Sequence, residues 1–443
     1  MLERIVAALR ARADIQGWSA RLIRSRAVQL YAVPDAVEAR RATASERYVI
    51  QVLRQTGGLD AAACGGGNAT LLPGDDIDTA IDAAALIAGL VQNQPYAMPA
   101  PSPLPDQPIA DPKIQADAEA TLDELLARLR AAAAAHPHVL LTAAELYAEE
   151  QTTHLLNSRG IDATQTGTTI DMEWVLLCRD GERATESFVE LRRRRVDDID
   201  IATEVAARAR QAADLLRAAA PPDYRGAVVL RGATLATFLN GGVIQTLGSA
   251  ATKFGKLSRW EIGEPVFHGP AAGDPLTVFA TRQLPFGVRA GRFDDEGQPA
   301  QRVELIRDGR LCAFTANQRY ADYLGIAATG DFGDIELPAG ATPEVALLAE
   351  PYVEVVAFSW FTPNEITGDF SSEIRLGYLV DGGRRTPFKG GALVGNLIEA
   401  LANARWSAEI GFYGDYQGPQ TARFGSLAIA GGEGSHQDTT NGQ

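Results

Sequence analysis

The side chains that could bind a metal ion or act as nucleophiles are few and widely spaced in this sequence. Its 443 residues contain five histidines and three cysteines. The HPH motif at 136–138 is typical of a turn after a helix, and His154 alternates with apolar residues as a structural histidine in a strand does. Cys64, Cys178 and Cys312 are far apart and odd in number, so we expect reduced structural thiols rather than a disulfide framework.

Pairs of carboxylates could serve as a general acid and a general base, and several pairs occur along the chain. All of them lie in contexts typical of turns or helix caps: Asp75/Asp76, Asp197/Asp198 and Asp294/Asp295. The CGGGN segment at 64–68 lacks the Lys-Ser/Thr of a phosphate-binding loop, so we expect a flexible turn there. An enzyme that uses acidic or histidine clusters assembled only by the fold remains one alternative.

Three segments in the second half of the chain carry a more specific pattern: LRGATLATFLNGGVIQTLG (230–248), ITGDFSSEIRLGYLVDGG (366–383) and PFKGGALVGNLIEALAN (387–403). Together they resemble the C-terminal half of the TldD/PmbA family of zinc peptidases. In that family's catalytic subunit the first segment is a helix with the motif H-E-x-x-x-H. The resemblance places Asn240, Gly241 and Gln245 at these positions, and none of them is a strong zinc ligand.

The family's catalytic subunit supplies a third zinc ligand, a cysteine, from a glycine-rich loop near its C-terminus. The matching segment here, FYGDYQGPQTAR (412–423), contains neither cysteine nor histidine. The resemblance therefore implies the non-catalytic TldE/PmbA-like branch, whose members pair with the zinc-bearing subunit. It implies no catalytic residue, metal or cofactor in this chain, and a zinc ion in a homologous TldD-like partner.

The resemblance also implies a function and a set of residues. Complexes of this kind cleave unfolded or leader peptides, and the chain would form part of the enclosed substrate chamber. The candidates for the chamber wall are Asn317, Arg319, Tyr320, Thr367, Asp369 and Ser371. Without its partner, the surface that would pair with the TldD-like subunit could support a homodimer. The alternative from another class is a stand-alone peptide-binding or scaffold protein that serves no peptidase.

Composition and charge exclude some partners. The formal net charge of −15 disfavours binding to duplex DNA, which requires a basic face, although members of this family are often labelled modulators of DNA gyrase. The one dense basic run, Arg192–Arg195, is bracketed by acids, and we expect a solvated edge with local ion pairs. No apolar run approaches the ~20 residues that span a bilayer, and the N-terminus lacks the apolar core of a signal peptide, so we expect a cytoplasmic protein.

The pattern of elements predicts an α+β fold with two domains. The N-terminal sheet-and-helix domain (1–222) includes a proline-rich connection at 95–112, and a mainly antiparallel, β-rich C-terminal domain (223–432) precedes a disordered tail (433–443). Turns are expected at 157–160 and 179–181. The expected helices span 2–13, 76–92, 113–135, 197–219, 233–247 and 394–404.

Overall fold

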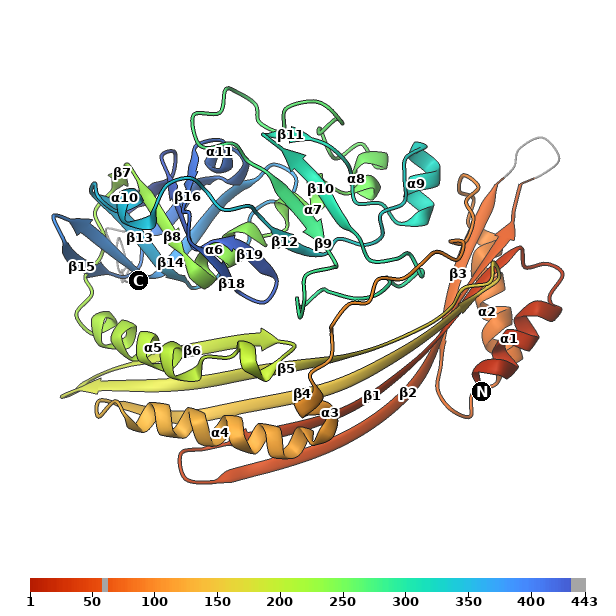
Figure 1. Ribbon diagram of the computed structural model, residues 1–443, viewed down its shortest axis with the longest axis horizontal. Coiled ribbons are helices and arrows are strands. Elements are labelled where there is room, and N and C mark those ends of the chain that lie inside the picture. Colours follow the sequence, from red (N-terminus) through yellow and green to blue (C-terminus); the bar gives the residue numbers. More distant parts are fainter. Residues whose placement is uncertain (58–62, 432–443) are drawn as a thin grey trace, which may run out of the picture.

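A curved six-stranded antiparallel sheet runs along one side of the molecule (Figure 1). The structure is a computed structural model that describes residues 1–57 and 63–431. The strand order is β3-β2-β1-β4-β5-β6. The strands are β1 (Gly17–Ala32), β2 (Val37–Gln55), β3 (Cys64–Leu71), β4 (Val139–Asn157), β5 (Asp162–Asp180) and β6 (Arg183–Arg193).

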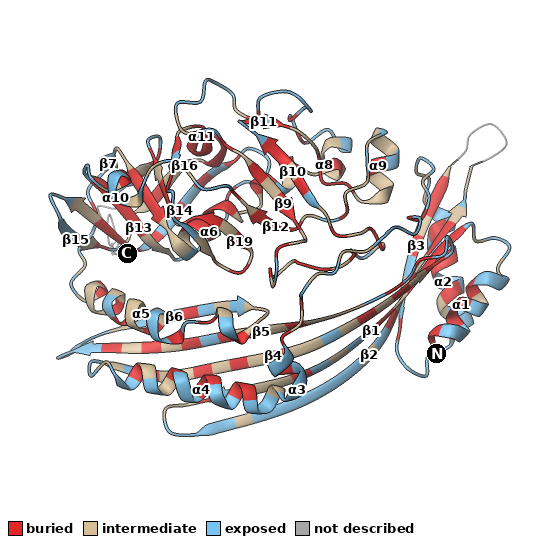
Figure 2. Ribbon diagram, viewed as in Figure 1, coloured by how far each residue is buried: buried red, intermediate tan, exposed pale blue. Residues whose placement is uncertain are grey.

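One face of this sheet is covered by helices. Trp18 and Leu22 of β1 pack with the first two helices at one end, and Leu30 packs with the later helices at the other end. These three residues lie on the same face because side chains alternate along a strand, an alternation also visible in Figure 2. The helices are α1 (Leu2–Ala11), α2 (Ile77–Leu90), α3 (Pro112–Ala116), α4 (Ala118–Ala134) and α5 (Ile201–Leu215), with a 3-10 turn at Val196–Asp198. The opposite face is left for the C-terminal half of the chain.

The glycine-rich segment at 64–68 is not the flexible turn that we expected, because it begins β3. Gly65 and Gly67 lie directly under α2. A Cβ atom on Gly65 would lie 1.7 Å from the carbonyl oxygen of Ala88, and one on Gly67 would lie 2.0 Å from that of Ala84. The glycines therefore allow close packing of a helix on a strand.

The remaining predictions for this half differ from the structure mainly at element ends. The connection at 95–111 contains neither helix nor strand, and turns join β4 to β5 and β5 to β6 at the expected places. The helix expected at 113–135 is divided at Asp117, whose side chain accepts a hydrogen bond from the backbone N–H of Ala120 and so begins α4.

The C-terminal half contains two further sheets. The six-stranded sheet has the order β11-β10-β9-β12-β19-β18, and eight strands of the nine-stranded sheet have the order β17-β20-β8-β13-β14-β16-β21-β7, with β15 paired to β14. Only the pairs β8–β13 and β12–β19 are parallel among the described strands, so the expected α+β fold with a mainly antiparallel C-terminal half is confirmed. The strands are β7 (Tyr224–Arg225), β8 (Val228–Arg231), β9 (Val278–Thr281), β10 (Arg302–Arg307), β11 (Arg310–Leu311), β12 (Asp334–Glu336), β13 (Tyr352–Phe358), β14 (Asp369–Asp381), β15 (Arg384–Phe388), β16 (Ala392–Asn396), β17 (Ala404–Trp406), β18 (Ile410–Phe412), β19 (Tyr416–Pro419), β20 (Thr421–Phe424) and β21 (Ala428–Ala430).

Short helices accompany these sheets around one large apolar core that includes Phe238, Phe424 and Tyr416. They are α6 (Gly232–Leu239), α7 (Val243–Leu247), α8 (Ala250–Phe254), α9 (Gln318–Leu324), α10 (Glu344–Leu347) and α11 (Leu397–Ala402). The helix expected at 394–404 is wrong in its first turn, because β16 runs to Asn396, whose side chain then caps α11. No helix among the described residues is long and apolar enough to cross a membrane. The tail expected at 433–443 lies outside those residues.

Candidate functional site

The segment aligned with the zinc-binding helix is broken in the middle. We expected one helix over 233–247, but α6 ends at Leu239 and α7 begins only at Val243. Asn240 caps α6, and its side-chain Nδ2 donates a 3.1 Å hydrogen bond to the carbonyl oxygen of Ala236. Gly242 follows with a φ of +91°, which an L-amino acid rarely adopts.

The loop between β13 and β14 packs into this break. A Cβ atom on Gly241 would lie 2.7 Å from Cε1 of Phe361, and one on Gly242 would lie 2.7 Å from a carboxylate oxygen of Glu365. Glu365 also accepts a 2.7 Å hydrogen bond from the hydroxyl of Thr246 in α7. The loop therefore fills the space where an acidic side chain at position 241 would have to lie.

Gln245, at the second histidine position of the motif, bonds to a cation. Its Oε1 accepts a 3.1 Å hydrogen bond from the guanidinium of Arg289. The loop at 412–423 also lies beside residue 289, because the carbonyl oxygen of Gly414 accepts a 3.0 Å hydrogen bond from the backbone N–H of Val288. Burial raises the pKa of Asp415 in this loop, and the charge of Arg289 acts in the opposite direction. The two segments aligned with the family's ligands thus meet around Arg289.

These residues do not fit a zinc ion. Two amides and a glycine stand at the positions of the imidazoles and the carboxylate, an arginine bonds to one of the amides, and the helix that would present the ligands is interrupted. Over residues 1–57 and 63–431, no group of three or more His, Cys, Asp or Glu side chains is arranged to hold a metal ion.

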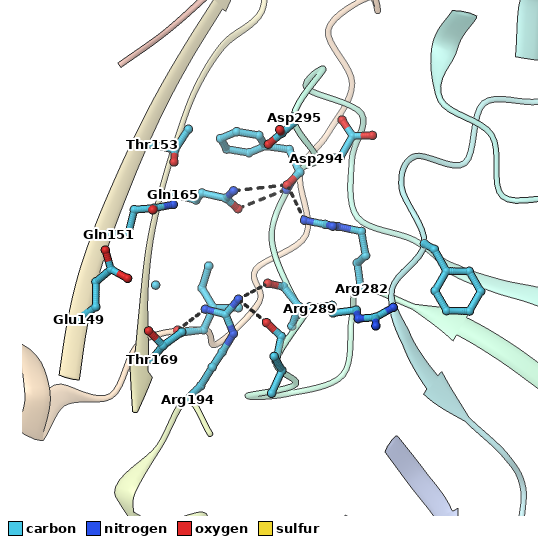
Figure 3. Close-up of a pocket in the computed structure, with 16 residues that line it drawn as sticks. Glu149, Gln151, Thr153, Gln165, Thr169, Arg194, Arg282, Arg289, Asp294 and Asp295 are labelled. Atoms are coloured by element: carbon cyan, nitrogen blue, oxygen red, sulfur yellow. Dashed lines mark hydrogen bonds between the residues drawn. The ribbon is translucent and has the colours of Figure 1, made fainter. Parts of the chain in front are cut away.

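Two neighbouring cavities adjoin this segment, and we call them together the chamber. The first, of about 350 Å³, lies between the helix-free face of the N-terminal sheet and the loop that carries Arg289 (Figure 3). The second, of about 300 Å³, lies between α7, α8 and α9. Phe332 lines both. On the sheet side, the first cavity is lined by Glu149, Gln151, Thr153, Gln165, Gly167 and Thr169.

The structure brings some of the candidate residues together in the second cavity. Gln245, Asn317 and Tyr320 all line it. Part of the hydrogen-bonding capacity of the Asn317 side chain is already used. Its Oδ1 accepts a 3.1 Å hydrogen bond from the backbone N–H of Tyr320 and so begins α9. Arg319 is directed elsewhere, towards Asn93 and Tyr323, to which it donates hydrogen bonds of 3.0 and 3.1 Å.

The other candidates, Thr367, Asp369 and Ser371, line neither cavity. They are exposed at the start of β14. Asn396 donates 2.8 Å hydrogen bonds to the backbone oxygen of Thr367 and to the carboxylate of Asp369. The bonds from Asn396 and Thr367 lower the pKa of Asp369. These three residues form a separate surface.

Sequence reasoning missed the arginines of the chamber. We expected the run Arg192–Arg195 to be a solvated edge, and Arg192 and Arg195 do form ion pairs with Asp171 and Asp198. Arg194 instead turns inward and donates to the carbonyl oxygens of residues 287, 288 and 290 at 2.7–2.9 Å (Figure 3). Burial lowers its pKa to about 10. No spacing in the sequence pairs Arg194 with a loop about 90 residues later, so no local signal could have found it.

Two buried aspartates support the same loop. Asp334, fully buried, accepts a 2.8 Å hydrogen bond from the backbone N–H of Arg289, and burial raises its pKa to about 7. Asp294 accepts backbone hydrogen bonds from Glu296 and Gln298, and burial followed by the charge of Asp331 raises its pKa to about 6. Both carboxyls accept hydrogen bonds from backbone N–H groups, which favours a structural role, and Oδ2 of Asp334 is buried without a partner among the described residues.

Sequence comparison identifies the C-terminal part of the chain. Residues 224–431 match the model of the PmbA/TldA metallopeptidase C-terminal domain. An uncharacterized protein of Methanocaldococcus jannaschii is 24% identical over 263 residues, which are 56% of this chain. The match spans 60% of that relative's length.

Solved structures resemble the chain over its whole length. TldE from Thermococcus kodakarensis has a TM-score of 0.79 at 17% identity, and a candidate modulator of a DNA gyrase from Thermotoga maritima has 0.82 at 16%. Each comparison covers 97% of this chain and 99% of the other. At such identities the likeness concerns the fold, while the match over 224–431 concerns the sequence. Residues 224–431 therefore form a C-terminal domain of the PmbA/TldA metallopeptidase type, and the chain as a whole shares the fold of TldE and of the candidate gyrase modulator.

Proposed function

We propose that this chain is the non-catalytic, TldE-like subunit of a heteromeric zinc metallopeptidase that cleaves unfolded or leader peptides. The observation that carries the proposal is the segment 240–245. Its helix is broken, the position of the catalytic glutamate is a glycine closed in by Phe361, and the position of a histidine is a glutamine bonded to Arg289. A homologous TldD-like subunit would hold the zinc ion, which supplies a metal-activated water.

The chain's own residues would bind and orient the peptide. The first cavity presents amide and hydroxyl groups from β4 and β5, including Gln151, Thr153 and Thr169. Such groups donate to and accept from a peptide backbone, and an extended chain exposes its backbone to them. A folded protein offers neither a free backbone nor a segment thin enough for cavities of this size.

Assembly is the first part of the test. The chain is co-expressed with a homologue that carries H-E-x-x-x-H, and the mixture is analysed by light scattering. We expect a stable heterodimer in the mixture, and the same interface could support a homodimer of the chain alone. A strict monomer under both conditions at micromolar concentration would favour a stand-alone binding protein or scaffold instead.

The second part fills the chamber. Thr169→Trp places an indole in the first cavity, and Asp180→Trp places the same side chain at the exposed end of the same strand. With the zinc-bearing subunit present, we expect Thr169→Trp to abolish peptide cleavage while assembly persists, and Asp180→Trp to behave as the unaltered chain does. Equal cleavage by both variants would contradict a role of this chamber in admitting substrate.

A further inference from the structure

Arg289 stands at the junction of the two cavities with most of its hydrogen-bonding capacity unused. It lines the first cavity, and its guanidinium bonds to Gln245, which lines the second. We infer that Arg289 binds a carboxylate of a peptide inside the chamber, either the C-terminal carboxylate or that of an acidic side chain. This inference rests on the proposed function in one respect only, that peptides enter the chamber.

The side chain of Arg289 has donors to spare. A guanidinium carries five N–H donors, and Gln245 is the only acceptor bonded to this one among the described residues. No carboxylate of the described residues lies within 4 Å of it, in contrast to Arg302, which pairs with Glu336. Arg289 is half-buried, so its remaining donors are accessible from the chamber. Its planar fork matches a carboxylate in two parallel hydrogen bonds.

The backbone on both sides of Arg289 is held in place before any ligand arrives. Its own N–H donates to Asp334, and the guanidinium of Arg194 donates 2.9 Å hydrogen bonds to the carbonyl oxygens of Val288 and Ala290. The Phe332 ring, 5.8 Å from the guanidinium carbon, provides an apolar wall. Such fixed surroundings lower the entropy that a ligand must lose on binding.

The acids that line the first cavity already have partners. Glu149 accepts a hydrogen bond from Ser25, Asp294 accepts from backbone N–H groups, and Asp295 pairs with Arg21. Burial raises the pKa of Asp334, whose charge acts on Arg289, to about 7, which reduces its negative charge near neutral pH. Burial also raises the pKa of Asp415.

A second arginine of the same cavity also has unused hydrogen-bonding capacity. Arg282 also lines the cavity, its Nε is buried without a hydrogen-bond partner in the described structure, and its NH2 group reaches only the carbonyl oxygen of Phe293, at 3.3 Å. A cavity with two incompletely bonded guanidiniums attracts an anion. The amide and hydroxyl groups of the sheet wall indicate that the anion belongs to a peptide.

Binding of four fluorescent peptides to the full-length chain, followed by fluorescence anisotropy, tests this inference. The peptides share one unstructured sequence. In the first pair neither peptide has an acidic side chain, and one ends in a free carboxylate while the other ends in an amide. In the second pair both peptides are amidated, and one carries a single Glu where the other carries Gln. We expect the carboxylate-bearing member of at least one pair to bind about tenfold more tightly or better. The pair that differs identifies which carboxylate Arg289 accepts.

Three variants complete the experiment. Arg289→Gln should erase the preference, and Arg289→Lys, which keeps the charge without the fork, should retain part of it. Arg307→Gln is the control, because Arg307 pairs with Glu304 beside the β10–β11 turn and lines neither cavity. The backbone bond from residue 289 to Asp334 survives each change at 289, and far-ultraviolet circular dichroism verifies the fold.

The inference would be wrong if the chain bound both members of each pair with equal affinity or bound none of the peptides measurably. It would also be wrong if Arg289→Gln kept the preference unchanged. The proposed function is tested separately. A carboxylate preference without any cleavage in the presence of the partner would contradict the proposed function but not the assignment of Arg289. Cleavage with the partner, but no preference among the four peptides, would sink the assignment of Arg289 alone.

Discussion

The guanidinium of Arg194 holds Gly287 across the chamber, with Nε donating a 2.7 Å hydrogen bond to the carbonyl oxygen of Gly287. Arg194 directly follows β6 of the N-terminal sheet, and Gly287 belongs to the loop that presents Arg289. The same guanidinium bonds to the carbonyl oxygens of Val288 and Ala290. Arg194 thus connects the two walls of the first cavity, as Gln165 does through its hydrogen bond from the backbone N–H of Arg292.

Replacing this arginine should loosen the chamber. Arg194→Met leaves several buried carbonyl groups without donors, and we expect it to reduce the free energy of unfolding by about 2–4 kcal/mol. Arg192→Met, in the same run, removes only an exposed ion pair with Asp171 and should cost less than about 1 kcal/mol. Urea denaturation measures both, and equal effects would show that the inward hydrogen bonds of Arg194 contribute nothing special.

The close contact at Gly241 predicts a steric effect. Gly241→Ala puts a methyl group 2.7 Å from the ring of Phe361 and 2.9 Å from Pro363, so the loop must move, and we expect a loss of about 1–3 kcal/mol. Gly425→Ala is the control, since no atom lies within 4 Å of its added methyl group. Thermal unfolding compares the two variants. If Gly241→Ala is as stable as the control, the break between α6 and α7 is not closed by this loop.

A zinc site should not be restored by replacing the motif alone. The triple variant Asn240→His, Gly241→Glu and Gln245→His would still present its side chains from two helices separated by Gly242, with no third ligand in the loop at 412–423. We expect no tightly held zinc by elemental analysis after dialysis, either in this variant or in the unaltered chain. About one zinc ion per unaltered chain would refute the assignment to the non-catalytic branch.

The raised pKa of Asp334 predicts a dependence of stability on pH. Because burial raises its folded-state pKa to about 7, the folded chain holds this proton more tightly than the unfolded chain does. The resulting stabilisation is complete below pH ~4 and is lost as the pH rises through about 7. Asp334→Asn removes this titration and keeps an oxygen for the N–H of Arg289.

The stability of Asp334→Asn relative to the unaltered chain should therefore increase between pH 4 and pH 8, by on the order of 3 kcal/mol. Urea denaturation of both proteins at a series of pH values measures the difference. A constant difference across this range would mean that the carboxyl of Asp334 titrates normally in the fold.

Local sequence patterns could predict those features of the fold that depend on interactions between neighbouring residues, such as helix caps. The helix expected at 76–92 is present as α2, which Asp76 begins with a capping hydrogen bond. The glycines at 65 and 67 were misread because their purpose, close approach to α2, is a contact between distant segments. The break after Asn240 was missed for the same reason, since Phe361 and Glu365 fill it from another loop.

The candidate site divides in the same way. Family resemblance pointed to Gln245, Asn317 and Tyr320, which line one cavity, but also to Thr367, Asp369 and Ser371, which do not. Arg194 lies about 90 residues before Arg282 and Arg289 in the sequence. It meets them only because the two halves of the chain pack against each other. The net charge gave no indication of these arginines, because the chain as a whole is acidic.

The central claim, that this chain serves a peptidase without catalysing hydrolysis itself, is tested most directly by one assay. An unfolded peptide is incubated with the purified chain, with its zinc-bearing homologue, and with both, each with and without a metal chelator. We predict no hydrolysis by the chain alone and chelator-sensitive hydrolysis by the mixture that exceeds that of the homologue alone. Chelator-sensitive hydrolysis by the isolated chain, or no effect of the chain on its homologue, would contradict the account.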